Sequence, residues 1–178
     1  THSTIDAVAA LRQTHSLTAD AVSSIRVVAG EGCTICNIQS PSTALEAKFS
    51  LRVTAAFALL GIDTSGLQTW DRVNDADVVA VRDRVAVDLV PGMGLSDSEV
   101  SIRLRDGREL RLAHDCGTPM ADKAAQSARV QAKFRALAGP LLGEARCEQV
   151  LALLDGLDGQ ADVRELVGQV AEAERASP

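Results

Sequence analysis

The sequence has very few aromatic side chains. Phe, Trp and Tyr together make up 2% of its 178 residues, with no tyrosine and one tryptophan. A core must therefore be built from alanine, valine, leucine and isoleucine, and few rings are left to stack on nucleic-acid bases. The length and the 46% hydrophobic content are nevertheless sufficient for a globular domain with a sizeable core.

An excess of positive charge is also lacking. The 18 lysines and arginines are outnumbered by 24 aspartates and glutamates, which gives a formal net charge of −6 at pH 7. Because binding to phosphates needs a basic surface, we expect no nucleic-acid partner.

Long apolar runs are absent as well. The longest candidate, residues 53–60, is far shorter than the roughly 20 residues that span a bilayer. No basic segment followed by an apolar one opens the chain as a secretory signal would. We therefore expect no membrane partner and no secretory signal.

Four cysteines are present, namely Cys33, Cys36, Cys116 and Cys147. Cys33 and Cys36 have the spacing of a redox pair or of half a zinc site. A clear second half of a zinc site is missing, since His114 and Cys116 do not have a usual ligand spacing. Ordinary reduced cysteines are favoured, with a metal site and a redox function as alternatives. The reduced state is typical of the cytosol, so we expect a cytoplasmic protein.

The first 41 residues predict a helix, a strand and a loop. Residues 5–13 place apolar side chains mostly on one side of a helix. Thr18 can cap a short second helix, and residues 24–28 have the composition of a strand. The glycines and the proline of residues 30–41 indicate a loop.

The most distinct predicted element is a helix that begins at Thr43. Thr43 and Glu46 have the spacing of a capping box, and Gly61 is expected to end the helix in a left-handed conformation. Between them, apolar side chains repeat at helical spacing, and we expect this stripe to be buried. Its members are Leu45, Phe49, Val53, Ala56, Phe57 and Leu60.

Further elements follow in the second half of the chain. Residues 75–84 predict a helix capped near Asn74, and residues 85–90 predict a strand. Apolar and polar residues then alternate on both sides of Asp106-Gly107, which predicts an antiparallel hairpin with a two-residue turn. Its solvated face is rich in arginine, namely Arg103, Arg105, Arg108 and Arg111.

From Met120 onward the sequence predicts helices. The first of them is expected to end at Gly139 and Pro140, and residues 173–178 are expected to fray. The order of elements predicts an α+β fold, with a small, mostly antiparallel sheet packed with helices and followed by C-terminal helices.

Several segments resemble the MmgE/PrpD family. Residues 1–7 resemble the TH..IDA start of a helix in that family, and residues 47–51, AKFSL, resemble its most specific motif. Residues 104–108 resemble its LKDG hairpin. Residues 117–119 and 132–134 resemble the segment that leads into its last helices. The order and spacing agree along nearly the whole chain, which therefore resembles the C-terminal part of such a protein.

The resemblance implies a two-domain enzyme of which this chain is the second part. The family has a large helical first domain and a smaller α+β domain that closes over the site. Residues 1–140 would be this lid-like domain, and residues 141–178 would be helices that pack on the helical first domain. The resemblance also implies a homodimer.

The family further implies a class of reaction. Its members include 2-methylcitrate dehydratase, cis-aconitate decarboxylase and iminodisuccinate epimerase, most of which move a proton next to a carboxylate without a cofactor. The resemblance thus implies a lyase or isomerase that acts on a small di- or tricarboxylate, with no cofactor and no metal.

The resemblance places the main catalytic residues upstream of Thr1, so we expect this chain alone to be inactive. Some relatives have an active-site tyrosine at the position of Val53, whose side chain has no proton to donate. This difference favours a dehydratase or an epimerase over a decarboxylase of that type.

Binding groups are what this chain can contribute. Proton abstraction next to a carboxylate needs cations or hydrogen-bond donors where negative charge develops. Lys48 and Arg52 are four residues apart and would share a helix face, where an anion would relieve their repulsion. We therefore predict substrate binding by Lys48, Arg52 and Ser50, and by His2 because it follows the family's catalytic segment. The alternatives are a solvated cationic face offset by Glu46, a structural His2, and a Ser50 that bonds to a helix carbonyl.

His15 and His114 are expected to be structural, and the arginine-rich hairpin is expected to be a solvated strand face or else a subunit contact.

Two other hypotheses about the function remain. The chain would alternatively be a non-catalytic α+β domain that binds a partner through exposed apolar surface. A metal or redox protein built on Cys33 and Cys36 is the third hypothesis.

Overall fold

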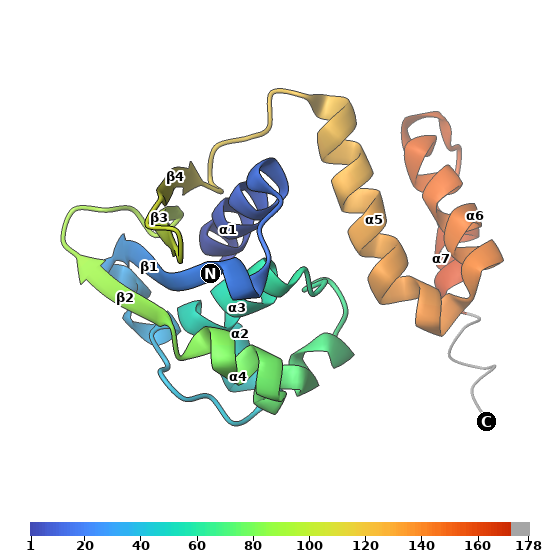
Figure 1. Ribbon diagram of the computed structural model, residues 1–178. Coiled ribbons are helices and arrows are strands. Elements are labelled where there is room, and N and C mark those ends of the chain that lie inside the picture. Colours follow the sequence, from blue (N-terminus) through green and yellow to red (C-terminus); the bar gives the residue numbers. More distant parts are fainter. Residues whose placement is uncertain (172–178) are drawn as a thin grey trace. The chain divides into compact units, whose positions relative to one another are not determined.

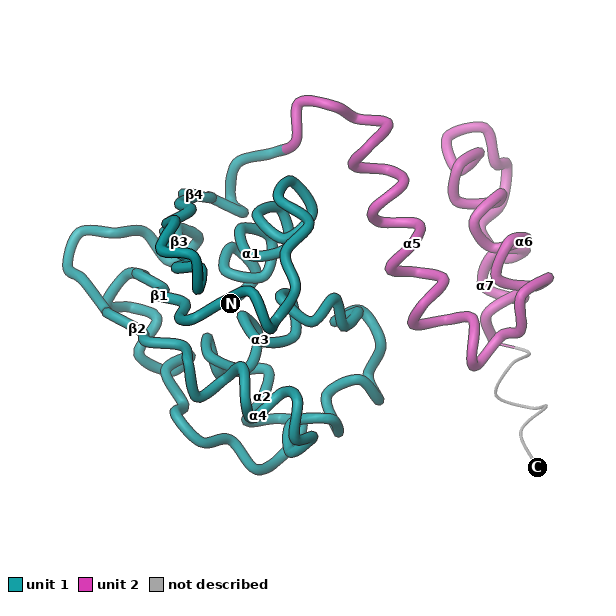
Figure 2. The backbone as a smooth tube through the Cα atoms, viewed as in Figure 1, with its two compact units in different colours: residues 1–119 teal, residues 120–178 magenta. Residues whose placement is uncertain are grey.

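The computed structural model describes residues 1–171, and the chain forms two compact units, residues 1–119 and residues 120–178 (Figure 2). The segment predicted to fray lies outside the described residues. The domain boundary predicted between residues 140 and 141 stays a prediction. Residue 140 lies inside a helix of the second unit.

Unit 1 contains a mixed four-stranded sheet with the strand order β2-β1-β3-β4. Its strands are β1 (Val22–Gly30), β2 (Val85–Val90), β3 (Asp97–Leu104) and β4 (Glu109–Asp115). β1 is antiparallel to β3, and β3 is antiparallel to β4, but β1 pairs with β2 in parallel. The predicted α+β fold is confirmed, and the parallel β1–β2 pair makes the sheet mixed rather than purely antiparallel.

Helices cover one face of this sheet (Figure 1). They are α1 (His2–His15), α2 (Ala44–Lys48), α3 (Leu51–Leu60) and α4 (Ala76–Arg82). α1 packs on β3, β4 and α3, whereas α3 also contacts β2 and α4. The core lies between the two layers, where Phe57 of α3 and Ile25 of β1 are almost fully buried. Three short 3₁₀ helices complete unit 1, namely η1 (Ala19–Ala21), η2 (Glu31–Cys36) and η3 (Gln68–Asn74).

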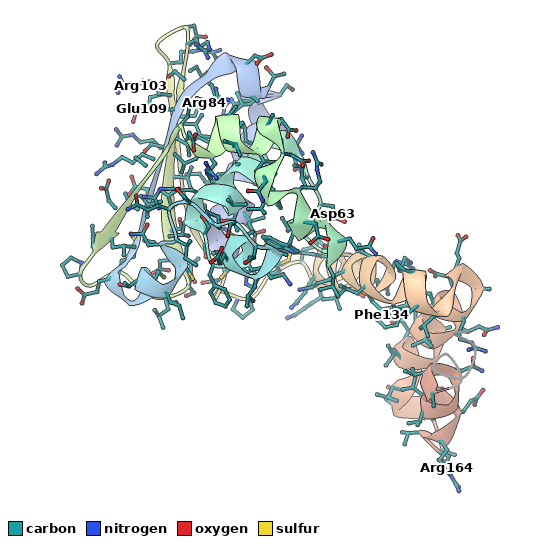
Figure 3. The ribbon with its side chains drawn as sticks, turned by 90° about the horizontal axis from the view of Figure 1, so that it is seen from below. Asp63, Arg84, Arg103, Glu109, Phe134 and Arg164 are labelled. Atoms are coloured by element: carbon teal, nitrogen blue, oxygen red, sulfur yellow. The ribbon has the colours of Figure 1, made fainter. Side chains whose placement is uncertain are left out.

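The predicted hairpin is formed by β3 and β4, with exposed arginines on its outer face. Figure 3 shows Arg103 beside Glu109, and their side chains form an ion pair at 3.3 Å. The predicted two-residue turn is wrong. The Leu104 N–H donates to the Arg108 carbonyl at 2.8 Å, which closes a three-residue loop in which Gly107 has a φ of +91°.

The described part of unit 2, residues 120–171, contains the helices α5 (Lys123–Leu142), α6 (Glu144–Asp155), η4 (Leu157–Gly159) and α7 (Arg164–Ala171). The predicted end of α5 at Pro140 is wrong, because the helix continues to Gly143, where φ reaches +78°. α5 and α6 are joined by two bonds from Arg135 to the Glu148 carboxylate, at 2.6 and 2.9 Å.

Candidate substrate-binding site

The AKFSL motif contains a break between α2 and α3. Ser50 is fully buried and caps α3, because its Oγ accepts a hydrogen bond from the Val53 N–H at 3.3 Å. The same Oγ donates to the Ile38 carbonyl at 2.7 Å, and an isolated β-bridge pairs Asn37 with Ser50. The predicted continuous helix is therefore wrong, since Ser50 adopts an extended conformation and begins a new helix.

The break changes which side chains are buried. The α3 part of the predicted stripe is buried, namely Val53, Ala56 and Phe57, and Leu60 is partly buried. Leu45 and Phe49 precede the break and are 65% and 38% exposed, so the predicted burial of these two side chains is wrong. Lys48 and Arg52 belong to different helices, so the predicted shared helix face is also wrong.

Arg52 is half-buried at the start of α3. Its Nη1 donates to Oδ1 of Asn37 at 2.6 Å, and no carboxylate pairs with Arg52 among residues 1–171. Burial lowers the pKa of Arg52 from its ordinary value, but an arginine remains charged at neutral pH. A guanidinium has five N–H donors, so donors are left to receive an anion.

Lys48 lies in the last turn of α2 and is half-buried. Its Nζ is 6.0 Å from the centre of the Trp70 ring, a cation–π distance, and Trp70 in turn lies 5.5 Å from the ring of Phe57. Trp70 is the single tryptophan of the chain. The fluorescence of Trp70 should therefore respond to a change at Lys48.

The predicted capping box of α2 is confirmed, and it occupies the carboxylate of Glu46. That carboxylate accepts hydrogen bonds from the backbone N–H groups of Ser42 at 2.7 Å and Thr43 at 3.1 Å. The bond from Ser42 is the main cause that lowers the pKa of Glu46. Glu46 forms no ion pair with Lys48 within the described part of the chain, so the two cations keep their charge largely uncompensated.

The beginning of α1 is attached to the hairpin. Ser3 is buried, and its hydroxyl donates to the Ser96 carbonyl and accepts from the Cys116 N–H at 3.3 Å. Thr4 and Ser98 share a buried hydrogen bond of 3.0 Å. The exposed His2 is the first residue of this helix, so its backbone is held close to the end of β4.

The two predicted structural histidines lie near opposite ends of α1. His114 of β4 is 3.4 Å from the carboxylate of Asp6, which connects the strand to the first turns of the helix. His15 is exposed in the last turn.

Cys33 and Cys36 lie on η2, close to the Arg52 site. Cys33 is buried and donates to the Leu95 carbonyl at 3.6 Å, whereas Cys36 is half-buried. Burial is the main cause that raises the pKa of the Cys36 thiol, and Cys33 raises it further. No cluster of three or more potential metal ligands occurs among the described residues.

Asn37 and Trp70 are two site residues that sequence reasoning missed. Asn37 follows Cys36 in a loop without periodicity, so no local pattern connected it with Arg52 fifteen residues later. Trp70 lies on η3, and only its rarity distinguished it in the sequence.

A separate hollow lies on unit 2. It has a volume of about 480 Å³ and is lined by residues of α5 and α6 that include Arg135, Pro140 and Cys147. Neither Lys48 nor Arg52 lines it.

The fold and the site define an α+β domain with two cations beside a helix break, neither of which forms an ion pair within residues 1–171. The sequence profile of the MmgE/PrpD C-terminal domain matches residues 1–157. The chain belongs to the MmgE/PrpD family, which is known in general for lyase and isomerase activity. A search of curated proteins returns no match to the chain. No helix within residues 1–171 is both long and apolar enough to cross a membrane.

Proposed function

We propose that this chain is the C-terminal portion of a cofactor-independent lyase or isomerase that moves a proton next to a carboxylate of a small di- or tricarboxylate. Membership of the MmgE/PrpD family supports the reaction class. The observation that carries the proposal is the half-buried Arg52, whose side chain bonds to the neutral side chain of Asn37 and to no carboxylate within residues 1–171.

A partly buried charge without a counter-ion favours the binding of an anion. Removing a guanidinium from water has a free-energy cost that a carboxylate offsets by Coulomb attraction and by paired N–H···O bonds. At about 4 Å and an effective dielectric constant of about 20, this attraction is about 4 kcal/mol before desolvation is subtracted. Arg52 would therefore bind a substrate carboxylate.

The other predicted residues receive distinct roles in this proposal. Lys48 adds positive charge near the same carboxylates and contacts Trp70. Ser50 has both of its hydrogen-bonding functions occupied by Ile38 and Val53, so it would position Arg52 rather than contact substrate. The acid and base would come from the part of the enzyme that precedes Thr1, with His2 next to them. A cytoplasmic location agrees with the four free cysteines.

Fluorescence of the single tryptophan tests carboxylate binding directly. Citrate should change the emission of Trp70 in a saturable way, because it would bind beside Lys48. Arg52→Gln should weaken citrate binding by about 10- to 100-fold, the loss expected for one charge-assisted interaction. Arg111→Gln is the matched control, since Arg111 is an exposed arginine of β4 that already pairs with Glu109.

Two results would contradict the proposal. The first is an emission that stays constant up to about 10 mM citrate, which is beyond the weakest affinities of specific sites. The second is an equal loss of affinity in the Arg52 and Arg111 variants. Proton NMR of di- and tricarboxylates incubated with the enzyme in its natural sequence context then tests dehydration, decarboxylation and epimerisation separately.

A non-catalytic domain that binds a partner is the second candidate function. Unit 2 favours it, because large apolar side chains of α5 and α7 are exposed, among them Val130, Leu141, Val167 and Val170. In this candidate function these side chains would contact a partner protein or a second copy of the chain. Light scattering tests the second copy, since a clean monomer without self-association would count against it.

A further inference from the structure

The two cysteines of η2 have the geometry of a dithiol that can close. Side chains at positions i and i+3 of a 3₁₀ helix eclipse one another, so Cys33 and Cys36 lie on the same side of η2. Three residues with a rise of about 2 Å each separate their Cα atoms by about 6 Å, within the 4.4–6.8 Å range of disulfides. Both cysteines are free in the structure.

The beginning of η2 is tightly packed against the loop between β2 and β3. A Cβ atom on Gly30, the residue before η2, would lie 2.3 Å from the Met93 carbonyl oxygen, so the two backbones approach closely here. Cys33 adds its hydrogen bond to the Leu95 carbonyl. This end of η2 therefore has little freedom to move.

The other end of η2 leads directly into the Arg52 site. Asn37 follows Cys36, pairs with Ser50 across an isolated bridge and accepts the hydrogen bond from Arg52. A displacement of Cys36 therefore reaches Arg52 through one intervening residue.

We propose that Cys33 and Cys36 form a reversible disulfide with a low-molecular-weight disulfide as the oxidant, and that this bond alters how Asn37 holds Arg52. Formation of the disulfide depends only on the geometry of η2. The consequence for substrate binding rests on the proposed function, because it assumes that Arg52 binds a carboxylate.

The reaction is thiol–disulfide exchange. Cys36 is the more exposed of the two, and its thiolate attacks the small disulfide, whose S–S bond breaks and releases one small thiolate. The Cys33 thiolate then attacks the Cys36 sulfur, forms the protein disulfide and expels the second small thiolate. The dithiol loses two electrons to the small disulfide, and the two protons that the cysteines release pass to the two small thiolates.

Closure of the bond has a structural cost on both sides of η2. Cys33 must give up its hydrogen bond to the Leu95 carbonyl, while the close approach of the Met93 backbone to Gly30 restrains the start of the helix. Because Cys33 lies at the restrained end, any adjustment of η2 on closure should fall on Cys36 and on Asn37, which follows it. The Asn37–Arg52 bond is expected to lengthen or break.

Peptide mapping tests the disulfide. The chain is incubated with oxidised glutathione, its remaining thiols are alkylated, and the tryptic peptide of residues 27–48 is weighed, which contains Cys33 and Cys36 but neither Cys116 nor Cys147. We expect this peptide to lose two hydrogens and to regain them with dithiothreitol. An unaltered dithiol, a stable glutathione adduct or a bond to another cysteine would overturn the proposal.

NMR tests the connection to Arg52 without any ligand. The side-chain amide of Asn37 and the Nε–H of Arg52 should shift on oxidation in the wild-type chain. Neither should shift in Cys36→Ser, which lacks the attacking thiol. Cys33→Ser leaves Cys36 as a glutathione adduct and therefore separates the effect of an adduct from the effect of the closed disulfide. A closed disulfide with both signals unchanged would overturn the coupling.

A citrate titration of the reduced and oxidised chains separates the two proposals. Binding that is at least about threefold weaker after oxidation supports the regulatory consequence, and equal affinity overturns it. If neither form binds citrate, the proposed function fails, while the peptide map and the NMR shifts still decide whether the dithiol acts on Arg52.

Discussion

Arg52 at the start of α3 donates to the side chain of Asn37 at 2.6 Å, which joins α3 to the end of η2. The bond connects two loops that carry most of the candidate site, namely the break between α2 and α3 and the segment after Cys36. Because one partner is charged, the bond contributes more than an average hydrogen bond.

Asn37→Ala should destabilise the chain and free the guanidinium of Arg52. Loss of a hydrogen bond to a charged group costs about 1.5–3 kcal/mol, although solvent reaching the half-buried Arg52 will reduce the effect. Urea denaturation measures it. Asn74→Ala is the matched control, because the exposed Asn74 makes only a neutral bond of 3.2 Å to the Ser42 carbonyl. Equal stability changes in the two variants would contradict a special role for Asn37.

Ser50→Ala should lower the free energy of unfolding by about 1–3 kcal/mol, because it removes the cap of α3 and leaves the Ile38 carbonyl without its partner. Thr18→Ala is the control. Thr18 stands at the N-cap of η1 but its side chain makes no capping bond, so its replacement should change stability little. Chemical denaturation of both variants checks the difference, and a large effect of Thr18→Ala would refute the assignment.

Phe57→Ala should destabilise unit 1 by about 3–5 kcal/mol, since this side chain is fully buried and contacts Trp70. Phe49→Ala should cost far less, because Phe49 is 38% exposed. Both residues belong to the stripe predicted for one continuous helix. Thermal or urea unfolding of the pair therefore tests the break at Ser50, and similar losses would indicate an unbroken buried stripe.

Glu46→Gln should produce a stability difference that depends on pH. Hydrogen bonds from Ser42 and Thr43 lower the pKa of Glu46 in the folded state. A lowered carboxyl pKa stabilises the folded state above the unfolded value of about 4.3, and this contribution disappears as the pH falls through the folded pKa. The variant keeps a capping side chain but cannot ionise. The free energy of unfolding of the wild type should therefore exceed that of the variant at neutral pH, and the two values should converge in acid. Unfolding curves between pH 7 and the acid range measure this, and a constant difference would exclude the charge as its cause.

Some features were predictable because they depend on a few neighbouring residues. The capping box needs only Thr43 and Glu46, and it was confirmed with both hydrogen bonds. The alternation around the β3–β4 loop assigned the exposed arginines correctly, since strand residues alternate between faces. The family motifs likewise depend on local residue order, and the profile match over residues 1–157 confirmed the family to which they pointed.

Other features depended on contacts between distant segments. Helical periodicity continued across residues 44–60, so nothing local announced that Ser50 would bond to Ile38 and divide the helix. The parallel pairing of β1 with β2 likewise depends on a crossover through residues 31–84, whose path no short pattern specifies.

The sequence alone thus determined the family, the α+β class and the presence of two cations in and beside the AKFSL motif, because caps, periodicity and motif order are properties of neighbouring residues. The tertiary structure alone decided that Lys48 and Arg52 lie on different helices and that Arg52 meets Asn37. Both results depend on the helix break at Ser50, whose buried hydroxyl bonds to the Ile38 carbonyl twelve residues earlier in the chain. The packing of unit 1 brings these two segments together.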